Sequence, residues 1–246
     1  ETGLAVEGYL LQPLKIEKRT PGVVCLHSTQ DFTIRQPAGL EGKPEVFFGL
    51  RLAQRGMTAF CPRCFLWQGE GSYLDHVARF QRRHPGCKGM AKMLWDASRG
   101  LDLLASLPQV DAERLGAVGH SLGAKESLYL AAFDERVKGA VSSEGGSGRA
   151  FSNWDAAWYL DKQSPANAFP HDHEELLALV APRAFLLVGG DSADGRRSWP
   201  YVDAALAAHR LHRPVARLGL LCHTAGHSVP PEAERRIDEW LQTYLG

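Results

Sequence analysis

The sequence has no excess charge of either sign. Its 28 Lys and Arg residues balance its 28 Asp and Glu residues, which leaves a formal net charge of zero at neutral pH. A protein that binds nucleic acid usually carries a basic surface that neutralises phosphates. The even balance therefore argues against nucleic acid as a partner.

Long hydrophobic runs are also absent. No apolar stretch approaches the roughly 20 residues that a membrane-spanning helix requires. The first residues, ETGLAVEGYL, show no basic segment followed by an apolar one, and the chain does not begin with Met. We expect a soluble protein with no membrane partner. Its location stays open between the cytoplasm and export with a signal segment absent from this chain.

The five cysteines cannot all pair in disulfides, because their number is odd. Cys25 and Cys222 lie in apolar runs and are interpreted as buried thiols. The other three, with one histidine, have the spacing C-x2-C and H-x2-C, which can hold zinc: Cys61, Cys64, His84 and Cys87. We expect free thiols and no metal, with zinc and a Cys64–Cys87 disulfide as open alternatives.

What the sequence does contain is a regular alternation. Short apolar runs, which predict strands, alternate with longer segments of helical periodicity. The predicted strands are residues 3–12, 21–27, 57–61, 114–120, 137–143, 183–189 and 216–223. The predicted helices are residues 44–55, 90–107, 122–133, 200–211 and 231–245. This order predicts an α/β fold, with a doubly wound, mostly parallel sheet and helices on both faces.

Residues 1–246 are expected to form a single domain, with the first strand at a sheet edge. Residues 62–89 and 144–173 are expected to be loop insertions that form the rim of a pocket. Residues 28–43, rich in Gly, Pro and polar side chains, also break the alternation. Long loops at the carboxyl ends of parallel strands are where α/β folds build their binding sites.

The sharpest motif is Gly119-His120-Ser121-Leu122-Gly123. It follows a predicted strand and precedes a predicted helix, which is the context of a G-x-S-x-G nucleophile elbow. The turn is too tight for large side chains at its flanking positions. It presents the serine hydroxyl at a helix N-terminus, where backbone N–H groups can hold an oxyanion. Ser121 is therefore the candidate nucleophile.

A serine nucleophile needs a base that takes its proton. His227 lies between the last predicted strand and the last predicted helix, where such a fold places its histidine. His223 is the rival, but it directly ends a strand, where a structural role is the simpler interpretation. His120 is interpreted as structural, because its side chain flanks the elbow rather than facing the serine.

The third member of a triad is a carboxylate that orients the imidazole and stabilises its charged form. Asp194 is the first choice, because it lies a few residues beyond the glycines that end strand 183–189. Glu144 is the second choice, since it follows the preceding strand and could reach the same histidine from there. Asp191 is the third choice. Any of these carboxylates could instead cap a loop or a helix.

An oxyanion hole needs two backbone N–H donors near the nucleophile. The first is expected from Leu122, the residue after the serine, and the second from a residue after strand 21–27. Ser28 and Thr29 occupy that second position, and the sequence leaves open which of them donates.

From about residue 21 onward the chain resembles the α/β-hydrolase superfamily, in particular the dienelactone hydrolase-like esterases. The resemblance rests on LHST, GHSLGAKESLYLAAFDERV, HEELLALVAPRAFLLVGG and the final GH. The run HEELLALVAPRAFLL is also similar to carbohydrate esterases that include glucuronoyl esterases and acetyl xylan esterase-like proteins. These resemblances imply an α/β-hydrolase fold and an esterase activity.

Two positions match the glucuronoyl esterases and one departs from them. Those enzymes place a lysine four residues after the nucleophile, where this chain has Lys125. Many of them carry their acid in a Q-E-S-G loop, to which SSEGG with Glu144 is similar. They also have an arginine directly after the serine, where this chain has Leu122, so the arginine's contribution to the oxyanion would be missing.

Residues and resemblance together imply a serine carboxylic-ester hydrolase that acts through an acyl-enzyme on a small or sugar-linked ester. Ser121 would attack the carbonyl and His227 would take its proton, with no cofactor. The alternatives within enzymes are a dienelactone or lactone hydrolase and a glucuronoyl esterase. The alternative outside them is a hydrolase fold that only binds its ligand.

The candidate substrate contacts are Lys125, Arg149 and Trp154. Lys125 lies one helical turn beyond the nucleophile and could contact a substrate carboxylate or hydroxyl, or else pair with Glu126 or solvent. Arg149 and Trp154 lie in the second insertion and could form a platform for a sugar, or simply pack within their loop. The run His171-Asp172-His173 is interpreted as a helix cap rather than a metal pair.

Overall fold

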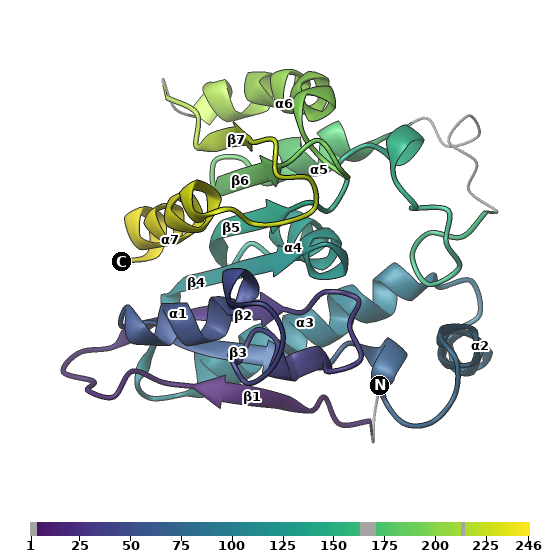
Figure 1. The fold of residues 1–246 in the computed structure, drawn as a ribbon, viewed down its shortest axis with the longest axis horizontal. Helices are drawn as coiled ribbons and strands as arrows, with labels where there is room; N and C mark the ends of the chain where they lie inside the picture. The colour runs from purple at the N-terminus through teal and green to yellow at the C-terminus, as the bar shows by residue number, and fades with distance from the viewer. Residues whose placement is uncertain (1–3, 163–170, 213–214) are drawn as a thin grey trace.

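The computed structural model describes residues 4–162, 171–212 and 215–246 (Figure 1). Within them, seven strands form one sheet in the order β1-β3-β2-β4-β5-β6-β7. The strands are β1 (Gly8–Leu11), β2 (Thr20–Leu26), β3 (Thr58–Pro62), β4 (Val110–His120), β5 (Val137–Ser143), β6 (Ala184–Gly189) and β7 (Leu218–Cys222). The edge strand β1 pairs antiparallel with β3, and the other neighbouring pairs are parallel. The predicted mostly parallel sheet is confirmed.

Helices cover both faces of the sheet (Figure 1). They are α1 (Phe48–Gln54), α2 (Tyr73–Arg83), α3 (Gly89–Ser106), α4 (Leu122–Phe133), α5 (His173–Leu179), α6 (Trp199–His212) and α7 (Pro231–Leu245). Helices α1 and α7 pack on one face, and α3, α4, α5 and α6 pack on the other. In these three described ranges, no helix combines the length and the apolar character needed to cross a bilayer.

Strand β2 shows why the central runs are apolar throughout. Val23 and Cys25 belong to the core beneath α1 and α7, whereas Val24 and Leu26 belong to the core beneath α3 and α4. Successive side chains of a strand point to opposite faces, so a strand covered on both sides buries every residue. Because β4, β5 and β6 run parallel, their carboxyl ends lie together along one edge of the sheet.

One predicted helix is divided in the structure. The sequence predicts a helix over residues 44–55, but a 3-10 turn (Pro44–Val46) precedes α1. Phe47, with φ −77° and ψ 52°, leaves helical geometry between them. The edge strand β1 is also shorter than the predicted 3–12, and residue 3 lies outside the described residues.

The insertion 62–89 contains α2, which the sequence analysis does not predict although Tyr73, Val77 and Phe80 recur at helical spacing. Its signal is local, because Ser72 and Asp75 form a capping box in which each side chain accepts a hydrogen bond from the other's backbone N–H. In the second insertion, residues 163–170 lie outside the described residues.

Candidate active site

Ser121 occupies the turn between β4 and α4 in a strained backbone conformation. Its φ of 58° and ψ of −113° lie in a region that non-glycine residues rarely adopt, at a cost of about 1–3 kcal/mol. The backbone N–H of Ser121 donates to the carbonyl of Ser143, the last residue of β5, at 2.9 Å. The turn is therefore tied to the neighbouring strand and presents the serine in one fixed position.

Two glycines make this turn possible. A Cβ at Gly119 would lie 2.1 Å from the carbonyl oxygen of Gly123. A Cβ at Gly123 would lie 2.3 Å from the carbonyl oxygen of Leu26, at the end of β2. Both contacts are with backbone atoms, which cannot rotate away, so the spacing G-x-S-x-G follows from the close approach of β2, β4 and α4.

Two hollows meet at Ser121. The larger, of about 520 Å³, lies against the loop 28–46, and the smaller, of about 290 Å³, lies against residues 144–159 and 192–193. Thr29, Ser121 and His227 line both. A bound ester could thus place one part on each side of the serine.

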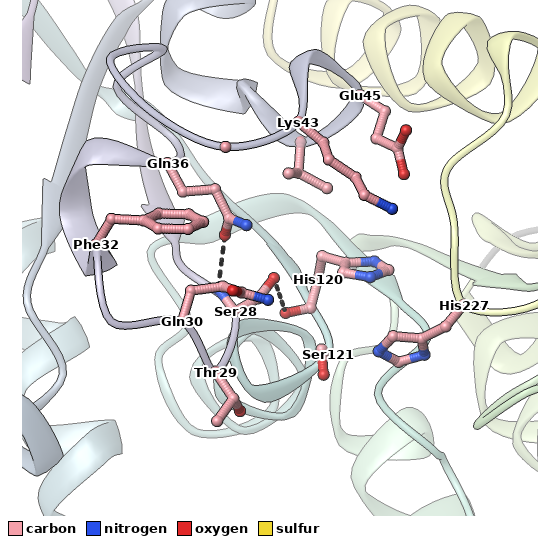
Figure 2. Close-up of a pocket in the computed structure, with 12 residues that line it drawn as sticks. Ser28, Thr29, Gln30, Phe32, Gln36, Lys43, Glu45, His120, Ser121 and His227 are labelled. Atoms are coloured by element: carbon pink, nitrogen blue, oxygen red, sulfur yellow. Dashed lines mark hydrogen bonds between the residues drawn. The ribbon is translucent and has the colours of Figure 1, made fainter.

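Figure 2 shows the larger hollow, with Ser121, His120 and His227 along one side and Phe32, Gln36 and Lys43 along the other. The insertion 62–89, expected at the rim, contributes no lining residue to either hollow within the described part of the chain. The loop that follows β2 takes that place.

His227 and Glu144 come together from different parts of the sheet. The Nδ1 atom of His227 lies 3.5 Å from Oε2 of Glu144. The Glu144 side chain is fully buried, whereas 47% of the His227 side chain is exposed. A histidine held at Nδ1 by a buried carboxylate keeps Nε2 available for a reacting group.

The Glu144 carboxylate is held ionised by its surroundings. Burial raises its pKa, but hydrogen bonds from His227 and from the backbone N–H groups of Gly190, Ala193 and Asp194 together lower the pKa below its ordinary value. Several donors aimed at one carboxylate stabilise its charged form. Glu144 can therefore serve as a permanent negative partner for the imidazole.

The other two candidate acids lie elsewhere. Asp194 is fully buried, and its oxygens accept hydrogen bonds from the backbone N–H groups of Gly146 and Ser147 and from the Ser198 hydroxyl. Asp191 is exposed and accepts from the backbone N–H of Arg196. The geometry thus reverses the order of preference. Our second choice, Glu144, faces His227, whereas the first choice, Asp194, binds the loop that follows Glu144.

The remaining histidines near the elbow have structural contacts. His223 is buried, and its Nδ1 accepts from the backbone N–H of Ala225 at 3.2 Å. His120 is buried against Ser143, and burial is the main cause that lowers its pKa to about 3. A neutral His120 leaves no second imidazolium beside His227, whose ring centre lies 4.8 Å away.

Ser28 and Thr29, the two candidates for the second oxyanion donor, differ in whether their backbone N–H already has an acceptor. The backbone N–H of Ser28 donates to Oε1 of Gln36 at 3.0 Å and is therefore occupied. The Thr29 N–H has no acceptor within the described residues, and Thr29 lines both hollows. Leu122 opens α4, where backbone N–H groups lack partners inside the helix. Thr29 and Leu122 are the available pair.

Lys125 lies on the wall of the smaller hollow but is only 4% exposed. Its Nζ donates to the carbonyl of Gly145 and to the hydroxyl of Ser152, the latter at 2.7 Å. Glu126, which the sequence offered as an alternative partner, is not one of these acceptors. The nitrogen also lies over the Trp154 ring, 4.0 Å from its centre.

The sugar platform considered for Arg149 and Trp154 is not formed. Trp154 is 2% exposed, and its Nε1 donates to the carbonyl of Gly146 at 2.7 Å. Arg149 donates to the carbonyl of His171 and lines a separate hollow of about 390 Å³. For Trp154 the structure thus shows the other alternative that the sequence left open, which is packing within the loop.

Cysteine placement departs from expectation at one position. All five cysteines are free thiols, and Cys64 and Cys87 form no disulfide. Cys25 is buried as expected, but Cys222 is exposed, because it ends the edge strand β7. In the described residues, no group of three or more His, Cys, Asp or Glu side chains could hold a metal ion.

Two residues that line the larger hollow, Gln36 and Glu45, and the buried His27 that follows β2 were given no role from the sequence. Gln36 holds the Ser28 backbone, and Glu45 accepts from the backbone N–H of Val229, two residues beyond the candidate base. His27 is buried, accepts from the backbone N–H of Cys64 at 3.0 Å, and has a pKa lowered to about 4, mainly by burial. The sequence pointed toward this loop through the polar composition of residues 28–43 and through the oxyanion candidates Ser28 and Thr29.

Comparison with known proteins gives one family and several partial matches. The sequence profile of the Dienelactone hydrolase family matches residues 6–167. The chain is 30% identical over 128 residues to a 4-O-methyl-glucuronoyl methylesterase of Cerrena unicolor, and 25% identical over 213 residues to one of Hypocrea jecorina. These regions are 39% and 72% of this chain, but only 26% and 44% of the two relatives. The chain thus matches less than half the length of either.

Solved structures show the same fold at low sequence identity. A glucuronoyl esterase from Solibacter usitatus matches with a TM-score of 0.75 and 18% identity, over 98% of this chain and 78% of that one. An acylaminoacyl peptidase from Pyrococcus horikoshii matches with a TM-score of 0.69 and 17% identity, over 98% of this chain and 40% of that one. These likenesses establish the α/β-hydrolase fold.

Proposed function

This chain belongs to the dienelactone hydrolase family, and we propose that it is a serine carboxylic-ester hydrolase with Ser121, His227 and Glu144 as its triad. The observation that supports this most is the 3.5 Å approach of the buried Glu144 carboxylate to His227 Nδ1, at the point where both hollows meet Ser121. A carboxylate in that position orients the imidazole and stabilises its charged form.

Acylation would proceed at the junction of the two hollows. The Ser121 Oγ attacks the ester carbonyl carbon while His227 Nε2 takes the hydroxyl proton. The oxyanion accepts hydrogen bonds from the backbone N–H groups of Leu122 and Thr29, each worth roughly 3–4 kcal/mol of the barrier. The bond to the alcohol oxygen then breaks, and that oxygen receives the proton from His227.

Deacylation reverses the same proton path. Water attacks the acyl carbon as His227 takes one of its protons, and the oxyanion again rests on the two backbone donors. The bond to Ser121 breaks, its oxygen regains the proton, and the carboxylic acid leaves. Glu144 stays ionised throughout, because three backbone donors stabilise its charge.

We further propose a sugar-linked ester as the substrate. The smaller hollow presents polar groups, among them Lys125, Ser152 and Asn153, which suit hydroxyl groups better than an alkyl chain. An ammonium group has three donors, and described residues accept two from Lys125, so one remains for a substrate hydroxyl. The similarity to proteins named 4-O-methyl-glucuronoyl methylesterases points to an ester of a sugar acid.

The test compares hydrolysis of p-nitrophenyl acetate, butyrate and octanoate with that of the methyl ester of glucuronic acid, wild type beside Ser121→Ala. We expect serine-dependent turnover that falls with acyl chain length, and a lower KM for the sugar ester. Labelling of Ser121 by a fluorophosphonate provides a second readout that needs no substrate. Folded wild-type protein that neither hydrolyses these esters nor reacts with the probe would contradict the proposal and favour a binding role.

A further inference from the structure

The loops after β5 and β6 are linked by two carboxylates, each of which accepts hydrogen bonds from the backbone of the other loop. The carboxylate of Glu144, after β5, accepts from three backbone N–H groups of the loop after β6, including that of Asp194. The carboxylate of Asp194 accepts in return from the backbone N–H groups of Gly146 and Ser147, at 2.7 Å each. Each loop is thus held by a side chain of the other.

The Asp194 carboxylate is buried and accepts three hydrogen bonds. It is 0% exposed, and its third donor is the hydroxyl of Ser198, at 2.7 Å. In the loop that follows Glu144, the carbonyl of Gly145 accepts from Lys125. The backbone that follows Glu144 is therefore held at a carbonyl by a cation and at two N–H groups by an anion.

The backbone at Glu144 needs such support. Its φ of 55° is left-handed, and a non-glycine residue pays about 1 kcal/mol or more to stay there. Gly146 is left-handed as well, with φ 78°. A change in the backbone of this loop would move the Glu144 carboxylate, which lies 3.5 Å from His227 Nδ1.

We infer that Asp194 is a positioning residue, which holds the loop 144–147 so that Glu144 faces His227 and which acts on the reaction through Glu144. The inference rests on the proposed function. In the described structure Asp194 contacts neither His227 nor either of the two hollows at Ser121. A direct role as the third triad member would require such a contact.

The test is a double-mutant cycle of Asp194→Asn and Glu144→Gln. Asparagine keeps the shape of the side chain, but its amide nitrogen cannot accept from a backbone N–H. We expect Asp194→Asn alone to lower kcat for p-nitrophenyl acetate by roughly 10- to 100-fold, as a displaced catalytic group does, with KM little changed. In the Glu144→Gln background, the same change should alter kcat by less than about twofold.

Fluorophosphonate labelling of Ser121 and the melting temperature are measured on the same four proteins. The labelling rate should follow the pattern of kcat. The melting temperature should fall with Asp194→Asn in both backgrounds, because the buried hydrogen bonds are lost either way. A gentler variant, Ser198→Ala, removes one donor to Asp194 and should lower kcat by about 2- to 5-fold, and only when Glu144 is present.

The cycle distinguishes an Asp194 that acts through Glu144 from one that acts independently. Equal losses of kcat with and without the Glu144 carboxylate would overturn the inference, since Asp194 would then act independently. If Asp194→Asn does not fold, the Ser198→Ala pair answers the same question. If the wild type shows neither turnover nor labelling of Ser121, both the proposed function and this inference are ruled out. If the wild type is active but the two substitutions lower kcat independently, only this inference is ruled out.

Discussion

The ammonium nitrogen of Lys125 lies 4.0 Å from the centre of the Trp154 ring, and both side chains are buried. Burial lowers the pKa of Lys125 to about 7, although the negative charge of Asp194 acts in the opposite direction. The aromatic face and two hydrogen-bond acceptors recover part of the cost of burying the cation. The folded protein therefore holds this lysine close to the point where it loses its charge.

This burial predicts a pH-dependent stability. A lysine in the unfolded chain has a pKa of about 10.4, so between about pH 7 and 10 the unfolded state binds more protons than the folded state. The contribution of Lys125 to the free energy of unfolding should therefore rise with pH across this window, by at most about 1.4 kcal/mol per unit. Urea unfolding at about pH 7 and 9, wild type beside Lys125→Met, measures it. An unchanged difference between the two proteins would contradict the prediction.

The candidate acids can be separated by a matched pair of substitutions. Glu144→Gln keeps the side-chain shape but removes the charge that faces His227, and kcat should fall by roughly 10³- to 10⁴-fold. Asp191→Asn changes an exposed carboxylate that accepts from the backbone N–H of Arg196, and kcat should stay within about twofold. Steady-state hydrolysis of p-nitrophenyl acetate tests both, and comparable losses in the two variants would refute the assignment of Glu144.

The two histidines after β7 make a second matched pair. His227→Ala should abolish turnover and the reaction of Ser121 with a fluorophosphonate, because no base remains to take the serine proton. His223→Ala removes a buried side chain that binds the backbone of Ala225, so it should lower the melting temperature more than His227→Ala does. The folded fraction of His223→Ala should still label. Loss of labelling in folded His223→Ala would instead favour His223 as the base.

The fold and the nucleophile could be predicted because both depend on local patterns. Doubly covered strands need continuous apolar runs, and the turn at Ser121 needs glycine at two positions where any Cβ would meet backbone. The acid could not be chosen in this way. Glu144, Asp191 and Asp194 all follow suitable strands, and their roles depend on a left-handed residue and on hydrogen bonds between loops distant in sequence.

The substrate contacts show the same limit. Whether Trp154 faces solvent or the core is set by packing against side chains from other elements, among them Tyr129 and His173, which no spacing reveals. Lys125 was identified from its position one turn after the nucleophile, but its partners, Gly145 and Ser152, come from the insertion. A local pattern carries no information about such long-range contacts.

The close approach at Gly123 supports a last prediction. A methyl group there would lie 2.3 Å from the carbonyl oxygen of Leu26, so Gly123→Ala must push α4 away from β2. We expect a loss of about 1–3 kcal/mol of stability and slower labelling of Ser121, because the start of α4 carries one oxyanion donor. Gly100→Ala is the matched control, since its Cβ would meet only side chains, the nearest being Phe60 at 3.2 Å. Labelling in Gly100→Ala should match the wild type, and equal labelling in Gly123→Ala would show that the elbow tolerates the shift.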